Sequence, residues 1–439
     1  MTMTSRDRAI DVARLASLVV VMFGHCFLLL ATVDGSGVHI GNLIGEVPAI
    51  APATWVAQVM PLFFLAGGAA GAYGYRAGIP WGSWLFTRAQ RLFRPVFWYL
   101  AAWSAGLLVV QMILGADSAA GLGGESVALL WFLGVYVVAL AFVPALIRLP
   151  SGRAVATTVI VLVAAATGMD VIRFATGIPG AGAANFLIVW LIPVVLGVAY
   201  ARQLIGPRIA AAVAVAALAA QLLLVTAGPY EVSLVVTGAE RVSNVSPPTL
   251  VLAMHCIWMS CAFVVVAGAL QRWARRPKVW NVVAAGNAGA MTIYLWHIVA
   301  IAIAAFSLNA VGLDAYDVTA PGFWGLLALR AVVFAAVMLV LFRLLSPLER
   351  RPLPWWDAPV TAAGARAAAA GALVCVAGVV LVVMAKFGLG DAPGWSALAG
   401  FLVIVAAARL IAAPAVRLVD HQPPSEKMTV VTPPVSPKT

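Results

Sequence analysis

Residues 10–31 read IDVARLASLVVVMFGHCFLLLA, an apolar run interrupted by only a few polar residues. A helix rises about 1.5 Å per residue, so this run can cross a hydrocarbon core about 30 Å thick. It is also longer than the apolar part of a secretion signal, which spans about 7–15 residues. The run therefore predicts a retained transmembrane helix.

The composition extends this prediction to the whole chain. Of 439 residues, 63% are hydrophobic and 10% are charged, and the mean hydropathy is +1.02, whereas soluble domains are about 45–50% apolar and about 25% charged. These values exclude a soluble globular protein and a disordered chain, and four cysteines are too few for a disulfide scaffold. Continuous rather than alternating apolar runs argue against a membrane β-barrel. We expect an all-α polytopic membrane protein of about twelve transmembrane helices, near residues 10–31, 52–74, 95–115, 125–147, 154–172, 185–205, 209–228, 248–270, 285–307, 322–345, 367–386 and 395–413.

The basic residues predict how these segments are oriented. A net charge of +11 would suggest nucleic-acid binding in a soluble protein, but here it fits basic cytoplasmic loops, and we expect no nucleic-acid partner. With the N-terminus inside and the spans alternating, every Lys and Arg falls on the cytoplasmic side except Arg173, Arg241, Lys386 and the intramembrane Arg330. The protein is therefore expected in the cytoplasmic membrane, in contact with the lipid bilayer, with both termini inside.

The chain divides into three parts. Residues 1–351 hold ten of the expected spans, and residues 352–413, which begin at the proline-containing stretch Pro352–Pro354, hold two more that carry few polar side chains. Residues 414–439 are polar and rich in proline, a composition typical of a disordered segment, here a cytoplasmic tail.

Polar residues inside the first span are the strongest functional pointers, because a charged side chain at the centre of a span costs about 2.5–3.5 kcal/mol. Arg14 and His25 are eleven residues apart, which is close to three helical turns, so both face the same way about 16 Å apart along the helix. Asp11 lies three residues before Arg14 and can pair with it. Two interpretations remain open: a snorkelling Arg with a buried structural His, or a cation and an imidazole that serve one site.

A basic segment, RAQRLFRP at residues 88–95, follows the second span. Arg88, Arg91 and Arg94 are spaced three residues apart, so we expect a helical start to place all three on one side. Guanidinium groups suit phosphate, but the same residues also fit an ordinary basic cytoplasmic loop.

Further polar residues occur in later spans. Tyr294 and His297 lie in the ninth, His255 in the eighth and Arg330 in the tenth, and all are candidates for lining a cavity or for buried hydrogen bonds. The histidines show no HxxxH or HExxH spacing and the cysteines no CxxC pair, so we expect no metal site.

Together these residues resemble the membrane-bound acyltransferase family 3. The resemblance covers about residues 6–351, the ten spans typical of that family, and one departure is Ala66, where the family often has Ser. The matching pieces are RDRAIDVAR at 6–14 with Arg14-X10-His25, Pro61-Leu-Phe-Phe64 with a following glycine, Arg88-x-x-Arg91 with Arg94-Pro95, and Tyr294-Leu-Trp-His297.

The resemblance implies transfer of an acyl group, acetyl or another short chain, from cytoplasmic acyl-CoA to a hydroxyl of an extracytoplasmic or membrane-embedded acceptor such as a glycan or glycolipid. His25 would be the general base, and Arg14 would be a second catalytic residue. Arg14, Arg88, Arg91 and Arg94 would hold the phosphates of acyl-CoA, a substrate rather than a permanently bound cofactor. No GxSxG elbow is present, which favours direct transfer over an acyl-enzyme.

Two other functions fit the same chain. Twelve spans with intramembrane His and Arg suit a proton-coupled secondary transporter, although no two-fold repeat and no GxxxDRxGRR-like loop is present. A non-catalytic membrane sensor or assembly subunit is the third interpretation. Acyl-CoA binding separates the first function from the other two, and proton-driven uptake separates the second.

Overall fold

The computed structural model describes residues 7–34, 37–238 and 240–413, and eleven segments in these ranges are helical, long and apolar enough to cross a membrane. The chain is therefore an all-α multi-pass membrane protein, as the sequence predicts. The predicted tail, 414–439, lies outside the described residues. The spanning helices are α1 (Arg8–Leu28), α4 (Met60–Gly74), α5 (Trp81–Leu114), α9 (Gly152–Thr176), α10 (Asn185–Ala201), α11 (Pro207–Ala227), α12 (Leu250–Trp273), α14 (Ala290–Asn309), α15 (Phe323–Arg350), α16 (Gly364–Phe387) and α17 (Ala392–Ala412).

Shorter elements connect or extend these helices. Those around α4 and α10 lengthen the corresponding membrane segments to Pro48–Gly74 and Gly180–Ala201. The shorter elements are β1 (Leu29–Asp34), β2 (Gly37–Asn42), α2 (Leu43–Glu46), η1 (Pro48–Ala53), α3 (Thr54–Ala57), α6 (Ala116–Ser126), α7 (Leu130–Leu140), α8 (Val143–Leu146), η2 (Pro179–Gly182) and α13 (Pro277–Ala288).

The expected span at 125–147 differs from the others because it is broken into α7 and α8. Pro144 has no N–H to donate to the carbonyl of Leu140, four residues earlier, and α7 ends at Leu140. At about 1.5 Å per residue, α7 alone is about 16 Å long and covers only part of the bilayer. The residues after it bring the chain to the start of α5, where Trp81 Nε1 donates to the Ala141 carbonyl at 2.7 Å. α7 is a buried internal helix packed against α4, α10 and α16, so the described part of the chain has eleven long spans and one shorter, interrupted inner segment.

The outer end of the first span also differs from the prediction. The helix stops at Leu28, and an antiparallel hairpin of β1 and β2 follows at once, with Leu29 opposite Asn42. The sequence predicts that the helix continues to residue 31 and that a loop follows. The segment after His25 is held in two ways: β1 pairs with β2, and β1 also packs against α14.

The start of α1 is fixed as well. Asp7 caps the helix by accepting from the N–H groups of Ala9 and Ile10. The hydroxyls of Tyr73 and Tyr200 donate to the other carboxylate oxygen of Asp7, at 3.0 and 2.9 Å. These bonds tie the beginning of α1 to α4 and α10.

Glycines allow the central helices to approach closely. A Cβ on Gly68 would lie 2.4 Å from the carbonyl oxygen of Val194, and one on Gly197 would lie 2.0 Å from that of Leu65. Since both contacts are with backbone, the α4–α10 interface cannot widen locally to admit a side chain.

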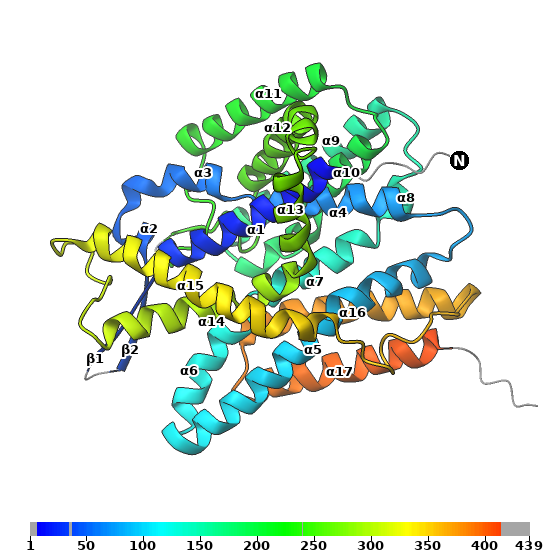
Figure 1. Cartoon of the computed structure of the whole chain (residues 1–439). Coiled ribbons are helices and arrows are strands. Elements are labelled where there is room, and N and C mark those ends of the chain that lie inside the picture. Colours follow the sequence, from blue (N-terminus) through cyan, green and yellow to red (C-terminus); the bar gives the residue numbers. More distant parts are fainter. Residues whose placement is uncertain (1–6, 35–36, 239, 414–439) are drawn as a thin grey trace, which may run out of the picture.

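The two C-terminal helices pack directly on the core. α16 contacts α7, α5 and α17, and a Cβ on Gly134 of α7 would lie 2.3 Å from the carbonyl of Gly378. The segment before α16 docks on α5, where Gln90 Nε2 donates to the Trp356 carbonyl and Trp356 Nε1 donates to the Gln90 carbonyl. Figure 1 shows α16 and α17 beside α5 at one side of the bundle.

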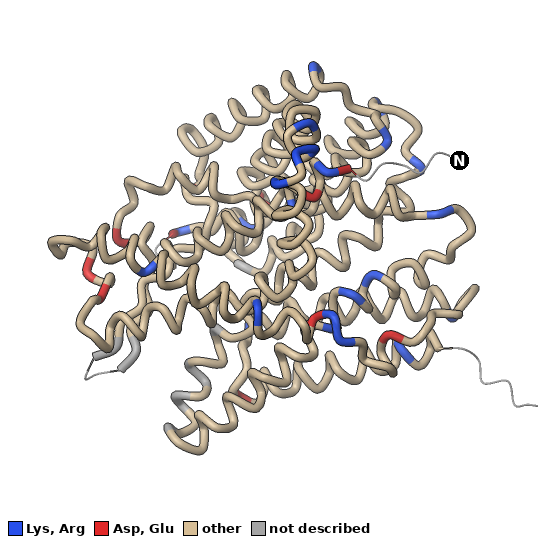
Figure 2. Tube along the Cα trace, in the orientation of Figure 1, with Lys and Arg blue, Asp and Glu red and all other residues tan. Residues whose placement is uncertain are grey.

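Charge is distributed unevenly along the helices. Figure 2 shows most Lys and Arg in the half of the molecule where α1 begins. The hairpin and the loop between α14 and α15, which carries Asp314 and Asp317, lie at the opposite end (Figure 1). One end of the bundle is therefore basic, and the other has few basic residues.

Candidate active site

Two histidines from distant parts of the chain meet inside the bundle. His25 Nδ1 on α1 lies 2.9 Å from His297 Nε2 on α14, a hydrogen-bonding distance, and the two rings are nearly parallel. His297 is fully buried, whereas His25 keeps part of its surface accessible. The structure thus joins the histidine of the Arg-X10-His motif to that of the Tyr-Leu-Trp-His segment.

The orientation of His297 is set within its own helix. Its Nδ1 lies 2.7 Å from the carbonyl oxygen of Tyr294, three residues earlier. The Tyr294 hydroxyl turns away and donates to the carbonyl of Leu129, just before α7. Tyr294 therefore contributes its backbone to the histidine pair and uses its side chain to join α14 to the short inner helix.

A second cluster lies toward the beginning of α1. The guanidinium groups of Arg14 on α1 and Arg88 on α5 interact electrostatically with Tyr136 of α7. Arg88 stacks 3.9 Å from the centre of the Trp84 ring. Arg14 makes no hydrogen bond or ion pair with any residue that the structure describes.

Glycine in the second-span motif makes room for this cluster. A Cβ on Gly67 would lie 2.6 Å from the Tyr136 ring and from its hydroxyl oxygen. The glycine thus lets the aromatic ring lie against α4. Tyr136 was not among the predicted site residues. The only signal for it in the sequence is a polar hydroxyl within the continuous apolar run of residues 130–146.

The three arginines of the basic segment separate in the structure. They lie on the first turns of α5, where each step of three residues falls about 60° short of a full turn, so Arg88 and Arg94 point about 120° apart. Arg94 forms an ion pair with Asp357 at 3.1 Å, and Arg91 is exposed. Only Arg88 is thereby brought to Arg14 and Tyr136.

Arg330 lies beside the histidine pair. It is 2% exposed, and its Nη2 donates to the carbonyl oxygen of Cys26 at 2.6 Å. Cys26 directly follows His25, so Arg330 binds the last turn of α1. Arg330 also interacts electrostatically with Asp314, and Asp314 accepts hydrogen bonds from Thr32 and Asn309.

Two other predicted cavity residues have structural partners. His255 is fully buried on α12, and its Nε2 bonds the carbonyl oxygen of Gln58 at 2.7 Å. Asp11 is 6% exposed, and its backbone carbonyl accepts from Asn287 Nδ2 at 2.9 Å. In the described part of the chain, no group of three His, Cys, Asp or Glu side chains is placed to hold a metal ion.

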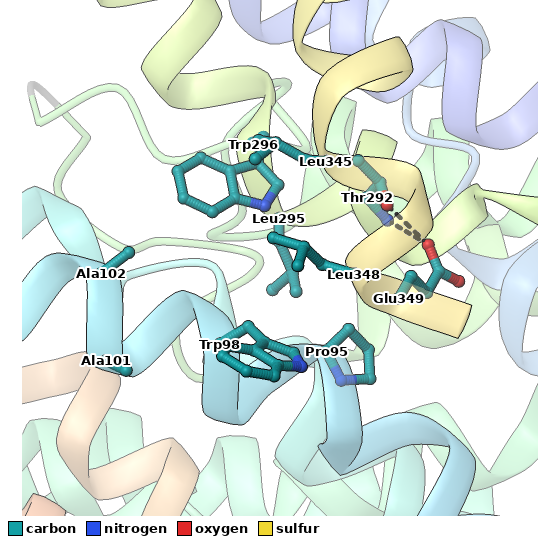
Figure 3. Close-up of a pocket in the computed structure, with 10 residues that line it drawn as sticks. All are labelled: Pro95, Trp98, Ala101, Ala102, Thr292, Leu295, Trp296, Leu345, Leu348 and Glu349. Atoms are coloured by element: carbon teal, nitrogen blue, oxygen red, sulfur yellow. Dashed lines mark hydrogen bonds between the residues drawn. The ribbon is translucent and has the colours of Figure 1, made fainter. Parts of the chain in front are cut away.

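A separate cavity of about 270 Å³ lies between α5, α14 and α15. Figure 3 shows Trp98 and Trp296 on facing walls, with Glu349 at one end. Glu349 accepts from the backbone N–H and the hydroxyl of Thr292, at 2.9 and 2.7 Å. The sequence does not predict this cavity, because its lining comes from three helices that are distant in the chain.

Comparison with known proteins gives one match. The family model described as an acyltransferase domain, that of acyltransferase family 3, matches residues 7–343 and so includes every element from α1 to most of α15. No curated protein and no solved structure matches the chain. The match confirms the resemblance found in the motifs, and its range includes both the histidine pair and the arginine–tyrosine cluster. The chain belongs to acyltransferase family 3, and its general activity is the transfer of an acyl group to an acceptor.

Proposed function

We propose that the protein transfers a short acyl group, by default acetyl, from acyl-CoA on the cytoplasmic side to a hydroxyl of an extracytoplasmic or membrane-embedded carbohydrate or glycolipid. The observation that carries this proposal is the arrangement of α1. One helix holds the guanidinium of Arg14, which has no ion-pair partner among the described residues, near the basic end of the bundle, and the partly exposed His25 about 16 Å further along.

The arginine–tyrosine cluster suits the phosphate-bearing end of the donor. Guanidinium groups form strong, charge-assisted bonds with phosphate oxygens. Arg14 and Arg88 both interact electrostatically with Tyr136, and we assign the phosphates to these two residues. Arg94 is already paired with Asp357, so we do not assign it to the phosphates. Phosphate binding by the exposed Arg91 stays a prediction from the sequence.

His25 is assigned to the thioester end of the donor, where the acyl group is transferred. In direct transfer, its free ring nitrogen takes the proton of the acceptor hydroxyl while the oxygen attacks the thioester carbonyl. The tetrahedral intermediate then expels the CoA thiolate, which receives the same proton. The products are an ester and CoA, and no covalent acyl-enzyme is needed.

The orientation follows from the charge distribution. We propose that the basic end, where α1 begins, faces the cytoplasm of the plasma membrane and that both termini lie there. The hairpin and the loop with Asp314 and Asp317 then face outward. The donor enters from the basic end and the acceptor from the opposite end or from the bilayer.

Thermal unfolding of the purified protein with CoA and acetyl-CoA tests the proposal without knowledge of the acceptor. A ligand at a hundredfold excess over Kd stabilises the folded state by about 2.7 kcal/mol. We expect wild type to be stabilised, Arg14→Ala and Arg88→Ala to be stabilised less, and Arg208→Ala, an exposed arginine on α11, to match wild type. A folded wild type that millimolar ligand fails to stabilise contradicts donor binding.

A further inference from the structure

We infer that His297 is a positioning residue that fixes the tautomer of His25, so that Nε2 of His25 is the atom that takes the acceptor proton. The catalytic part of this inference, proton transfer to His25 Nε2, rests on the proposed function. Its structural part, the protonation pattern of two buried rings, stands on the hydrogen bonds alone.

The pattern starts at the backbone of α14. The carbonyl oxygen of Tyr294, 2.7 Å from His297 Nδ1, can only accept, so Nδ1 carries the hydrogen. His297 is fully buried, and it bonds to no carboxylate among the residues that the structure describes. A buried, unpaired imidazolium is costly, so the ring is neutral and its Nε2 is a lone-pair acceptor.

The pattern continues to α1. The acceptor at His297 Nε2 requires a donor 2.9 Å away, so His25 Nδ1 carries a hydrogen. Neutral His25 then presents a lone pair at Nε2. This nitrogen makes no hydrogen bond in the described part of the chain, and it is not among the unpaired atoms that are sealed from solvent. Nε2 of His25 is therefore the acceptor that a substrate hydroxyl would meet.

His255 shows what a structural histidine looks like in the same bundle. It also bonds one backbone carbonyl, but its other nitrogen, Nδ1, is sealed from solvent and has no partner. No substrate can use that atom. The chain from the Tyr294 carbonyl through His297 to His25 differs because it ends in an accessible acceptor.

The neutral partner suits a base inside a membrane. When His25 takes a proton at Nε2, its Nδ1–H bond to His297 becomes charge-assisted and stabilises the imidazolium. A carboxylate in place of His297 would add a buried charge in every resting molecule, at a considerable desolvation cost. His297 orients the base without that permanent charge.

Nitrogen-15 NMR of the full chain with labelled histidine tests the tautomer directly. The protein has five histidines, and His25→Gln identifies the His25 signals by difference. We expect wild-type His25 to carry its proton on Nδ1, the tautomer that free histidine disfavours, and His297→Phe to shift it toward Nε2. A wild-type His25 protonated on Nε2 overturns the inference, whether or not the protein is an acyltransferase.

Kinetics test the role in transfer. His297→Phe removes the acceptor, and we expect kcat to fall about 10- to 100-fold, less than the roughly 10²–10⁴-fold that a general base itself contributes, with acetyl-CoA binding unchanged. His297→Gln retains an oxygen acceptor and should recover most of the activity, whereas His255→Gln controls for the loss of a buried histidine. Equal loss in the Phe and Gln variants, with both folded, overturns the positioning role. Absence of transfer by wild type instead refutes the proposed function.

Discussion

Arg330 Nη2 of α15 donates to the carbonyl oxygen of Cys26 at 2.6 Å and so holds the helix turn that carries His25. A charged donor at the carbonyl end of a helix also favours its dipole. The bond therefore links the position of the candidate base to a helix more than three hundred residues away in the chain.

Replacing Arg330 should test this link. Arg330→Met removes a hydrogen bond to a charged donor, worth about 1.5–3 kcal/mol, and we expect a lower melting temperature and a reduced kcat. Binding of acetyl-CoA, at the other end of α1, should be retained. Calorimetry with and without acetyl-CoA, together with transfer kinetics, measures all three quantities. Full kcat in a folded Arg330→Met protein would show that the bond does not position His25.

His25 itself gives the strictest test of the mechanism. We expect His25→Ala to abolish transfer, because its one described histidine neighbour, His297, is fully buried, and to keep the acetyl-CoA stabilisation seen in wild type. Transfer assays and thermal unfolding of the same preparation provide the two readouts. Retained activity refutes the assignment of His25 as the base.

Arg94 and Asp357 should behave as a structural pair. Each single alanine variant is expected to lower thermal stability, and a double-mutant cycle should give a coupling of roughly 0.5–3 kcal/mol. Acetyl-CoA should stabilise all three variants as it does wild type, since the pair joins α5 to the segment before α16. If Arg94→Ala removes the response to acetyl-CoA and Asp357→Ala does not, Arg94 belongs to the donor site.

Gly67 offers a test of the arginine–tyrosine cluster. Gly67→Ala places a methyl group 2.6 Å from the Tyr136 ring, so the ring must move, and we expect weaker acetyl-CoA binding with some loss of stability. Gly106→Ala on α5 is the matched control, because a Cβ there meets nothing within 4 Å. Thermal unfolding with and without ligand compares the two. Identical ligand responses would separate Tyr136 from the donor site.

The proposed orientation can be tested with an impermeant thiol reagent on intact cells. In a background without the four native cysteines, Ala49→Cys lies in the exposed segment after α2, and Ala77→Cys lies in the exposed loop between α4 and α5. We expect labelling of the first and not of the second before lysis, and of both afterward. The reverse pattern would invert the topology.

The sequence predicts those features that depend on local periodicity. Length and hydropathy predict the long helices, and eleven-residue spacing places Arg14 and His25 on one face of α1. Even the break after Leu140 has a local signal in Pro144. In these cases the physical cause lies within one helix, so no knowledge of packing is required.

Features that depend on packing could not be predicted in this way. The partner of His25 lies 272 residues further along the chain, and that of Arg94 lies 263 residues further. Several polar residues were available for each, and only the arrangement of the helices selects among them. The hairpin after Leu28 was missed for a related reason, since its first residues continue the apolar run of α1.

Because α1 is anchored at both ends, the distance between Arg14 and His25 along it is fixed. Asp7 is bound by two tyrosines at one end, and Cys26 is bound by Arg330 at the other, so the spacing of Arg14 and His25 cannot adjust to the ligand. A donor held by its phosphates at Arg14 must present its thioester about 16 Å away. Selection among donors then depends on the length of the arm between phosphate and sulfur, and a thioester that lacks this arm loses binding affinity at the Arg14 end.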